Sequence, residues 1–507
     1  MKTFRRETIG IYILLILFGV PLLVNLKYQD IIQVKSTFYL VVTGIFYAIV
    51  AIAIIGKYLI DRKMGIEMRT PKEVAKSFDP LDWSLIAFGI LILLSAITSR
   101  FPKKDVFFGT RAQLTGALML LFLVISYFII SRGAEAAKKS YAFAFYASSL
   151  AVEVFGLLNR LRIDPLEMHK ENVLDTFTFM TSTVGNVDYF YAFTSIIILF
   201  FAAYRADMEW DVRGFAVDAL LIICYMNFWT TRAGGILAAF SYGLPALLLI
   251  SLTSYTRFRN LFWQGTLQGI AALICTVIRQ KYVAWDIFWG TDTIVMGFYD
   301  KKLWIILGIV CAVIWFLLGN IKKNKKEDEF IKNISVIKLP VIALSCVSMA
   351  IFEGLILFYR PMQDITGRTF IWDDLKIAFQ MSSIREKLLG VGPGCMDNTL
   401  IDLGIHTPEQ SYFLTAHNEV FEYWFLCGII GAVVYVVFMA SFFYNFYRNV
   451  LSPEEAAMPH YRDMLCCGVL FATYLGQGLT NGPYVINIVV GFTFLALYRR
   501  FQIPDEE

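Results

Sequence analysis

The chain has 507 residues, of which 57% are hydrophobic and 17% are charged, and its formal net charge is +4. Soluble domains are about 45–50% apolar and about 25% charged. This composition, with a mean hydropathy of +0.60, therefore excludes a soluble protein and indicates an integral membrane protein. The small positive charge is scattered along the sequence, which excludes a nucleic-acid-binding protein.

Taken in chain order, the apolar segments predict an all-α polytopic membrane protein with about fourteen transmembrane helices, because each span needs about 20 mostly apolar residues. The first segment lacks a small-residue cleavage site, so we interpret it as a retained helix rather than a signal peptide. Residues 1–507 then form a single polytopic membrane domain. The predicted helices cover residues 10–26, 36–60, 81–98, 115–130, 140–158, 186–204, 214–230, 232–251, 261–279, 303–319, 339–358, 418–446, 462–480 and 483–499.

The distribution of lysine and arginine predicts the orientation, because cytoplasmic loops are enriched in both residues. With the N-terminus inside, the internal segments hold more of these residues than the external ones. This places both termini in the cytoplasm. The loop 359–417, which is the longest polar interval between apolar segments, then lies on the outer face.

Within this external loop the spacing of apolar residues predicts a helix that lies flat on the membrane surface. The apolar positions are Trp372, Leu375, Phe379 and Leu388, and the polar ones are Asp373, Lys376, Arg385 and Lys387. The glycines of the segment 390–394 are expected to end this helix.

Four arginines are predicted at the same outer boundary: Arg232, Arg279, Arg360 and Arg368. A guanidinium group stays charged and offers a planar fork of donors to phosphate oxygens, so several of them suit a lipid diphosphate. The alternative is that each arginine extends to the interface or caps a helix C-terminus.

His417 stands where the external loop returns to an apolar run. An imidazole titrates near neutral pH, so it could take a proton from a sugar hydroxyl. The alternative is an interfacial histidine that is hydrogen-bonded to a helix end. For Glu153, Glu353, Glu419 and Glu422, at the outer ends of their helices, we expect charge pairing that fixes the arginines rather than direct catalysis.

No cofactor or metal is predicted. The sequence has four histidines far apart and no CxxC or CxxH pair, whereas structural metal sites need closely spaced ligands. Seven of the eight cysteines lie in apolar runs and only Cys395 lies in the external loop, so no disulfide framework is expected. The glycine-rich turn at 390–394 is not a nucleotide loop, because no strand precedes it and no Gly-Lys-Ser/Thr follows.

Several short motifs, in the same order, resemble the O-antigen ligase and polymerase superfamily. His417-Asn418, followed after nine residues by Gly428-Ile429-Ile430-Gly431, is similar to the histidine signature of that superfamily. The other resemblances are Gly367-Arg368 with Trp372, the segment 389–394, Thr231-Arg232-Ala233-Gly234 and Gly185-Asn186-Val187-Asp188. Threonine and alanine depart from the Ser-Arg-Gly pattern at 231–233. The motifs cover residues 185–431, and the remaining segments match by hydropathy alone.

The resemblance implies a metal-independent, inverting glycosyltransferase whose donor is an undecaprenyl-diphosphate-linked glycan. It implies that Arg232 and Arg368 hold the diphosphate and that His417 activates the acceptor hydroxyl. Around them we expect Arg360, Arg279, Asn418, Trp372 and Glu422 to contact the substrate. The implied partners are the lipid bilayer, a chain-length regulator and other polysaccharide-assembly proteins, in the cytoplasmic (inner) membrane.

Three functions remain open at the level of the sequence. Within the superfamily the chain could be a polymerase or a ligase, and the number of predicted helices favours a polymerase. A transporter or flippase of lipid-linked oligosaccharides would also need arginines for a diphosphate, but it would carry charges at several depths and needs no long external loop. A lipid-linked peptidoglycan glycosyltransferase of the shape-and-division type would need an external aspartate. Asp364, Asp373 and Asp374 are candidates, and the histidine signature would be unexplained.

Overall fold

The computed structural model describes residues 2–25, 28, 31–65, 70–110, 115–136, 139–169, 180–230, 235–281, 301–319, 323–359, 368–408, 415–452 and 460–503. Over these residues the chain forms nineteen helices and a single pair of two-residue strands. The helices are α1 (Lys2–Leu22), α2 (Ile31–Lys63), α3 (Pro71–Lys76), α4 (Pro80–Thr98), α5 (Lys103–Phe108), α6 (Ala117–Gly133), α7 (Ser140–Arg160), α8 (Val187–Arg205), α9 (Val212–Thr230), α10 (Gly235–Ser251), α11 (Tyr255–Lys281), α13 (Lys301–Gly319), α14 (Lys323–Phe358), α16 (Thr369–Met381), α17 (Ile384–Leu389), α18 (Met396–Asp402), α19 (Glu419–Leu451), α20 (Tyr461–Gln477) and α21 (Val485–Gln502). Strands β1 (Met180–Thr181) and β2 (Gly185–Asn186) pair antiparallel.

Nine of the helices in the described residues are long and apolar enough to cross a membrane, and α6 and α10 are shorter apolar helices. Each of the apolar segments predicted from the sequence overlaps one helix, so the all-α membrane architecture is confirmed. The count of fourteen spans stays a prediction, because α1, α20 and α21 do not meet the criteria of length and hydropathy. Helices α20 and α21 are buried along almost their whole length, so their polar residues face protein rather than lipid.

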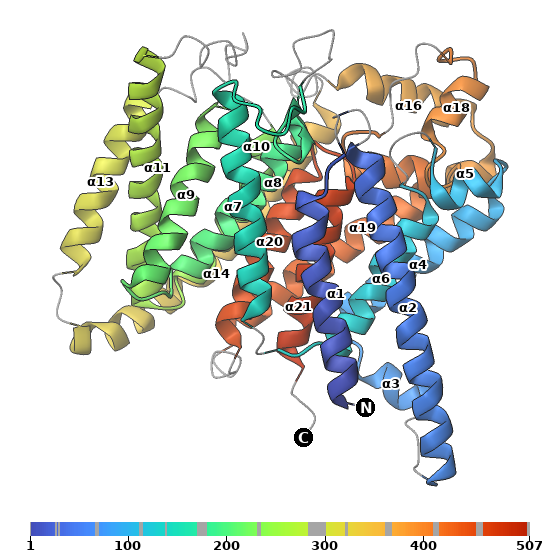
Figure 1. The fold of residues 1–507 in the computed structure, drawn as a ribbon, viewed down its shortest axis with the longest axis horizontal. Coiled ribbons are helices and arrows are strands. Elements are labelled where there is room, and N and C mark those ends of the chain that lie inside the picture. Colours follow the sequence, from blue (N-terminus) through green and yellow to red (C-terminus); the bar gives the residue numbers. More distant parts are fainter. Residues whose placement is uncertain are drawn as a thin grey trace.

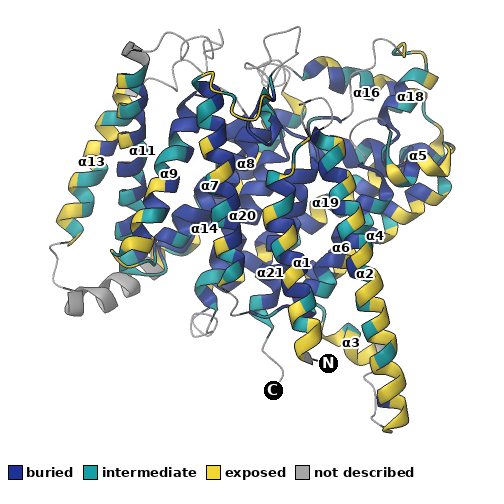
Figure 2. Ribbon diagram, in the orientation of Figure 1, coloured by how far each residue is buried: buried dark blue, intermediate teal, exposed yellow. Residues whose placement is uncertain are grey.

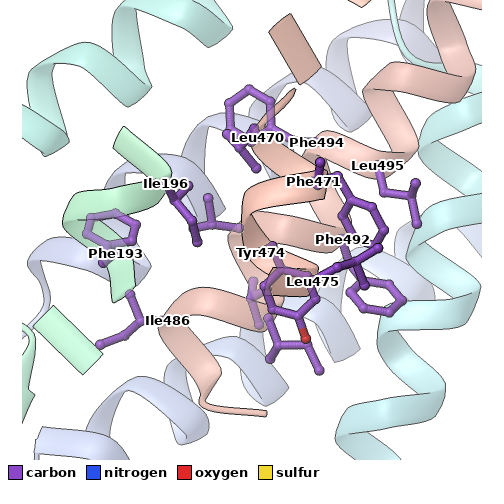
Figure 3. Packing of buried hydrophobic residues seen from close by; sticks show 14 of the residues in the cluster. Phe193, Ile196, Leu470, Phe471, Tyr474, Leu475, Ile486, Phe492, Phe494 and Leu495 are labelled. Carbon is purple, nitrogen blue, oxygen red and sulfur yellow. The ribbon is translucent and has the colours of Figure 1, made fainter. Parts of the chain in front are cut away.

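The core of the protein lies where α8, α20 and α21 pack together (Figure 2). Buried aromatic and aliphatic side chains from these three helices interdigitate in Figure 3, among them Phe193 of α8, Phe471 of α20 and Phe492 of α21. The rings of Phe471 and Phe492 meet edge to face with centroids 5.9 Å apart, a geometry that aromatic pairs prefer. By contrast, α13 is exposed along most of its length (Figure 2), as expected of a helix that borders lipid.

The two ends of the helical bundle are formed by different elements. Helix α1 begins and α21 ends at the lower end in Figure 1, whereas α16 and α18 lie at the upper end. The lower end contains buried ion pairs. Arg499 of α21 lies 3.0 Å from both Asp79 and Asp82 at the start of α4, and Arg132 of α6 also binds Asp82 at 2.8 Å. These contacts fasten three helices to one another.

Replacing Arg499 by alanine is expected to destabilise the protein by about 3–5 kcal/mol, because it leaves a buried carboxylate without one of its cationic partners. Asp82 is completely buried. The thermal unfolding midpoint in detergent measures this effect. The matched control is Arg213→Ala, which removes an exposed partner of Asp211 and should leave the midpoint nearly unchanged, because solvent screens exposed ion pairs. Equal midpoints for the two variants would contradict the assignment.

The external loop predicted at 359–417 is largely helical and packed in its described part. The predicted amphipathic helix is present as two helices, because the helical conformation is interrupted between α16 and α17. Ser383 caps α17, with its hydroxyl accepting from the backbone N–H of Glu386, and a new N-cap interrupts a helix at that point. The predicted stop is confirmed, since Gly390 follows α17 with a φ of 83°.

Candidate functional site

The glycine-rich turn after α17 packs directly against a kink in α19. Gly428 interrupts α19 with a φ of 75°, which frees backbone carbonyls of the preceding turn. The N–H groups of Val391 and Gly392 donate to the carbonyls of Phe425 and Leu426 at 3.2 and 3.1 Å. A Cβ on Gly390 would collide with the Leu426 carbonyl. This close crossing fixes the start of α19 relative to the loop helices.

A Gly428→Ala substitution is expected to destabilise this crossing, because φ is in the left-handed region and the added Cβ would meet the carbonyl of Leu388. The backbone strain alone costs about 1–3 kcal/mol. The thermal unfolding midpoint and the yield of folded protein in detergent should both fall. Gly354→Ala in α14 is the control, since a Cβ there meets nothing within 4 Å. Loss of stability in the control but not in Gly428→Ala would refute this explanation.

The loop before α19 presents His417 through a dense set of hydrogen bonds. The indole N–H of Trp372 donates to the carbonyl of Ala416 at 2.8 Å, and the N–H of Ala416 donates to the carboxylate of Glu422 at 2.6 Å. Asn418 caps α19, accepting from the N–H of Phe421, and its amide N–H donates to the carbonyl of Leu479. His417 itself has a φ of 49°, an uncommon conformation that often marks functional residues.

Tyr484 and Thr415 surround one side of the imidazole. Nδ1 of His417 lies 3.3 Å from the hydroxyl of Tyr484, which lies 3.2 Å from the hydroxyl of Thr415. The backbone N–H of His417 donates to that same Thr415 hydroxyl at 3.2 Å. Tyr484 comes from the turn between α20 and α21, so two segments that are far apart in the sequence meet at the histidine.

Burial lowers the pKa of His417 to about 4, with a further lowering from the nearby Arg368 guanidinium and an opposing contribution from Asp188. The imidazole is therefore neutral at neutral pH. A neutral imidazole has a lone pair that can accept a proton. The charges of Arg368 and Asp188 both act on the ring, so these three residues belong to one site.

Arg368 is held by the N-terminal turn of α8. Its guanidinium donates to the carboxylate of Asp188 at 3.3 Å, and the hydroxyl of Tyr191 donates to the other oxygen of that carboxylate at 2.7 Å. Asn186 caps α8 by accepting from the N–H of Asp188. Asn481, in the turn after α20, donates to the Asp188 carbonyl at 3.4 Å. Arg368 is thus positioned by α8 although it precedes α16.

An apolar groove of about 520 Å³ lies between the end of α14, α16 and α19. Phe358, Phe421, Trp424 and Lys376 are among the residues that line it. Phe421 also stacks on Trp372 with ring centroids 5.0 Å apart. The wall of the groove is therefore continuous with the loop that carries His417.

The other predicted site residues have different outcomes. Arg232 and Arg360 lie outside the described residues, and of Arg279 only the backbone, in the last turn of α11, is described. Trp372, Asn418 and Glu422 lie around the His417 loop but are buried, and their contacts support the backbone. The acidic residues bind hydroxyl or amide donors in the described part of the chain: Glu153 binds Thr194 and Asn227, Glu353 binds Tyr242, and Glu419 binds Tyr435 and Tyr474.

The sequence analysis assigns no role to three residues of the site: Asp188, which lies in one of the motifs, and Tyr484 and Thr415, which lie in none of them. Asp188, Tyr484 and His417 all lie at the N-terminal ends of helices. A comparison of the polar residues at the helix ends that are predicted on the outer side of the membrane would therefore find Asp188 and Tyr484. Among the described residues, no group of three or more histidine, cysteine, aspartate or glutamate side chains is arranged to hold a metal ion.

The fold and the site together define a class: a helical, multi-pass membrane protein with a polar cluster of arginine, aspartate and histidine at one end of the bundle. No protein-family model matches the chain, and a search of curated proteins finds no match.

Proposed function

We propose that this protein is a membrane glycosyltransferase that moves a glycan from undecaprenyl diphosphate to a sugar hydroxyl on the outer face of the cytoplasmic membrane. The observation that carries the proposal is the position of the His417 imidazole, held by Tyr484, near the Arg368–Asp188 ion pair. The resemblance of the histidine and arginine motifs to the O-antigen ligase and polymerase superfamily supports the same activity.

The arginine side of the site suits the leaving group. When the bond between the anomeric carbon and the diphosphate breaks, negative charge builds up on the phosphate oxygens, and a fixed guanidinium stabilises that charge. Asp188, whose carboxylate also accepts from the hydroxyl of Tyr191, fixes the Arg368 group before substrate arrives. Arg232 would add a second guanidinium in this proposal.

The histidine side of the site suits the acceptor. The acceptor hydroxyl loses its proton to the imidazole as its oxygen attacks the anomeric carbon, and attack from the face opposite the diphosphate inverts that carbon. Binding of a dianionic diphosphate beside Arg368 offsets the positive charge that lowers the pKa of His417. The donor would thereby raise the basicity of His417 when the base is needed.

The surroundings of the site support a lipid-linked donor. The groove lined by Phe358, Phe421 and Trp424 offers an apolar surface next to the site, as an isoprenoid chain requires. The site lies at the end of the bundle opposite the start of α1 and the end of α21 (Figure 1). If both termini are cytoplasmic, as the lysine and arginine distribution predicts, the reaction takes place outside.

Gel and thin-layer analysis of lipid-linked glycans from cells that lack the protein tests the proposed function. A polymerase predicts that single lipid-linked repeat units accumulate, and a ligase predicts that long lipid-linked chains accumulate. Unchanged lipid-linked glycans would contradict both. If the protein is instead a flippase, cells that lack it should keep the lipid-linked glycans on the inner leaflet, where an externally added glycosidase cannot reach them.

A further inference from the structure

Hydrogen-bond capacity limits the tautomer of His417. A neutral imidazole carries a proton on one nitrogen and a lone pair on the other. The hydroxyl of Tyr484 lies 3.3 Å from Nδ1. If Nδ1 carries the proton, the hydroxyl oxygen accepts a hydrogen bond from Nδ1–H, and the lone pair is on Nε2. If Tyr484 donates instead, Nε2 carries the proton and cannot serve as a base.

The neighbours of Tyr484 favour the first arrangement. The Thr415 hydroxyl oxygen accepts from the backbone N–H of His417 and lies 3.2 Å from the Tyr484 hydroxyl, so its second lone pair can accept the proton of Tyr484. The side chain of Tyr189 is a further hydrogen-bond partner of Tyr484, as a donor to its oxygen. The Tyr484 oxygen then has its lone pairs for Tyr189 and for the Nδ1–H of His417.

We propose that Tyr484, together with Thr415, is a positioning residue that holds His417 in the Nδ1–H tautomer and so leaves Nε2 as the base. This inference rests on the proposed function, since it assigns the atom that takes the acceptor proton. During transfer, the acceptor O–H proton moves to Nε2 while the acceptor oxygen bonds the anomeric carbon. The bond from that carbon to the diphosphate oxygen breaks, and its electron pair leaves with the diphosphate. The Nδ1–H···Tyr484 bond persists and orients the imidazolium, as second partners of catalytic histidines do.

Nitrogen-15 NMR of histidine-labelled full-length protein in nanodiscs, at neutral pH, tests the tautomer directly. The sequence has four histidines, and the His417 signals are those that disappear in His417→Gln. We expect the wild-type protein to show the Nδ1–H tautomer, and Tyr484→Phe to shift it towards Nε2–H. A wild-type Nε2–H tautomer, or one unchanged in Tyr484→Phe, would overturn the proposal.

Kinetics with a polyprenyl-diphosphate-linked glycan provide the second readout. Tyr484→Phe should lower kcat at least about 10-fold while the KM for the donor stays unchanged, because the phenylalanine ring keeps the packing but loses the acceptor for Nδ1–H. The control is Tyr444→Phe, an exposed tyrosine of α19, for which no change is expected. Thr415→Val, which keeps the side-chain shape but removes the hydroxyl, should lower kcat by a smaller factor. Thr415→Ser, which keeps the hydroxyl, should have a kcat close to that of the wild-type protein.

The two readouts separate this inference from the proposed function. If the tautomer shifts as expected but the wild-type protein transfers no glycan, the positioning role stands and the proposed function fails. If transfer depends on His417 but Tyr484→Phe has wild-type kcat and tautomer, the proposed function stands and the positioning role fails.

Discussion

Replacing His417 by alanine is expected to lower glycan transfer by about 10²–10⁴-fold, the range that a general base contributes. The substitution removes the lone pair that takes the acceptor proton but leaves Arg368 and its Asp188 partner in place. Binding of the lipid-linked donor should therefore persist while transfer is lost. Transfer by the purified protein and the ladder of polymer lengths in cells both measure this effect.

A histidine at the opposite end of α20 is the control for this substitution. His460 precedes α20, whereas the other end of that helix meets Asn418 through Leu479. His460→Ala should keep wild-type ladders. Normal ladders from His417→Ala, in protein that is expressed and inserted normally, would remove the catalytic assignment.

Replacing Arg368 by lysine is expected to lower donor use by about 10²–10³-fold, which is the typical effect of losing one preorganised donor to a developing oxyanion. Lysine keeps the charge but not the planar fork, so it cannot bind Asp188 and a phosphate with separate N–H groups at fixed angles. We expect the loss in kcat/KM for the lipid diphosphate donor. His417 should remain neutral and in place.

The control for Arg368→Lys is Arg385→Lys, because Arg385 pairs with Glu386 at the junction of the loop helices. That variant should retain donor use. An Arg368→Lys enzyme with unchanged kcat/KM would show that the guanidinium fork does not hold the diphosphate. Asp188→Asn should give a smaller loss of the same kind, since it weakens the group that orients Arg368.

Much of the fold could be predicted from the sequence because hydropathy is a local property. Each apolar segment overlaps a helix, and Gly390 ends α17 where expected. The break between α16 and α17 is not predicted from the spacing, because the apolar positions continue across it, whereas the Ser383 cap acts on only one turn. The number of spans is less predictable, since α20 and α21 are enclosed by protein and need not be apolar on every face.

The site was only partly predictable, because its residues come from distant segments. The motifs of the sequence single out Arg368 and His417 at the predicted outer boundary, and the structure places both near Asp188. Sequence spacing does not show that Tyr484 reaches His417 or that Glu422 holds the Ala416 N–H. Arg232, Arg279 and Arg360 remain predictions.

Titration of His417 by NMR, with and without a short-chain polyprenyl diphosphate, tests the central claim that the imidazole and the guanidinium form one reaction centre. We expect a pKa of about 4 in the free protein. The folded protein should therefore keep the base form until the pH approaches about 4, whereas its stability should decrease from about pH 6.5 downward, because the unfolded chain binds the proton first. The pKa should rise in Arg368→Gln, which removes a positive charge, and when the diphosphate binds. A pKa near the ordinary histidine value that neither change moves would contradict the account.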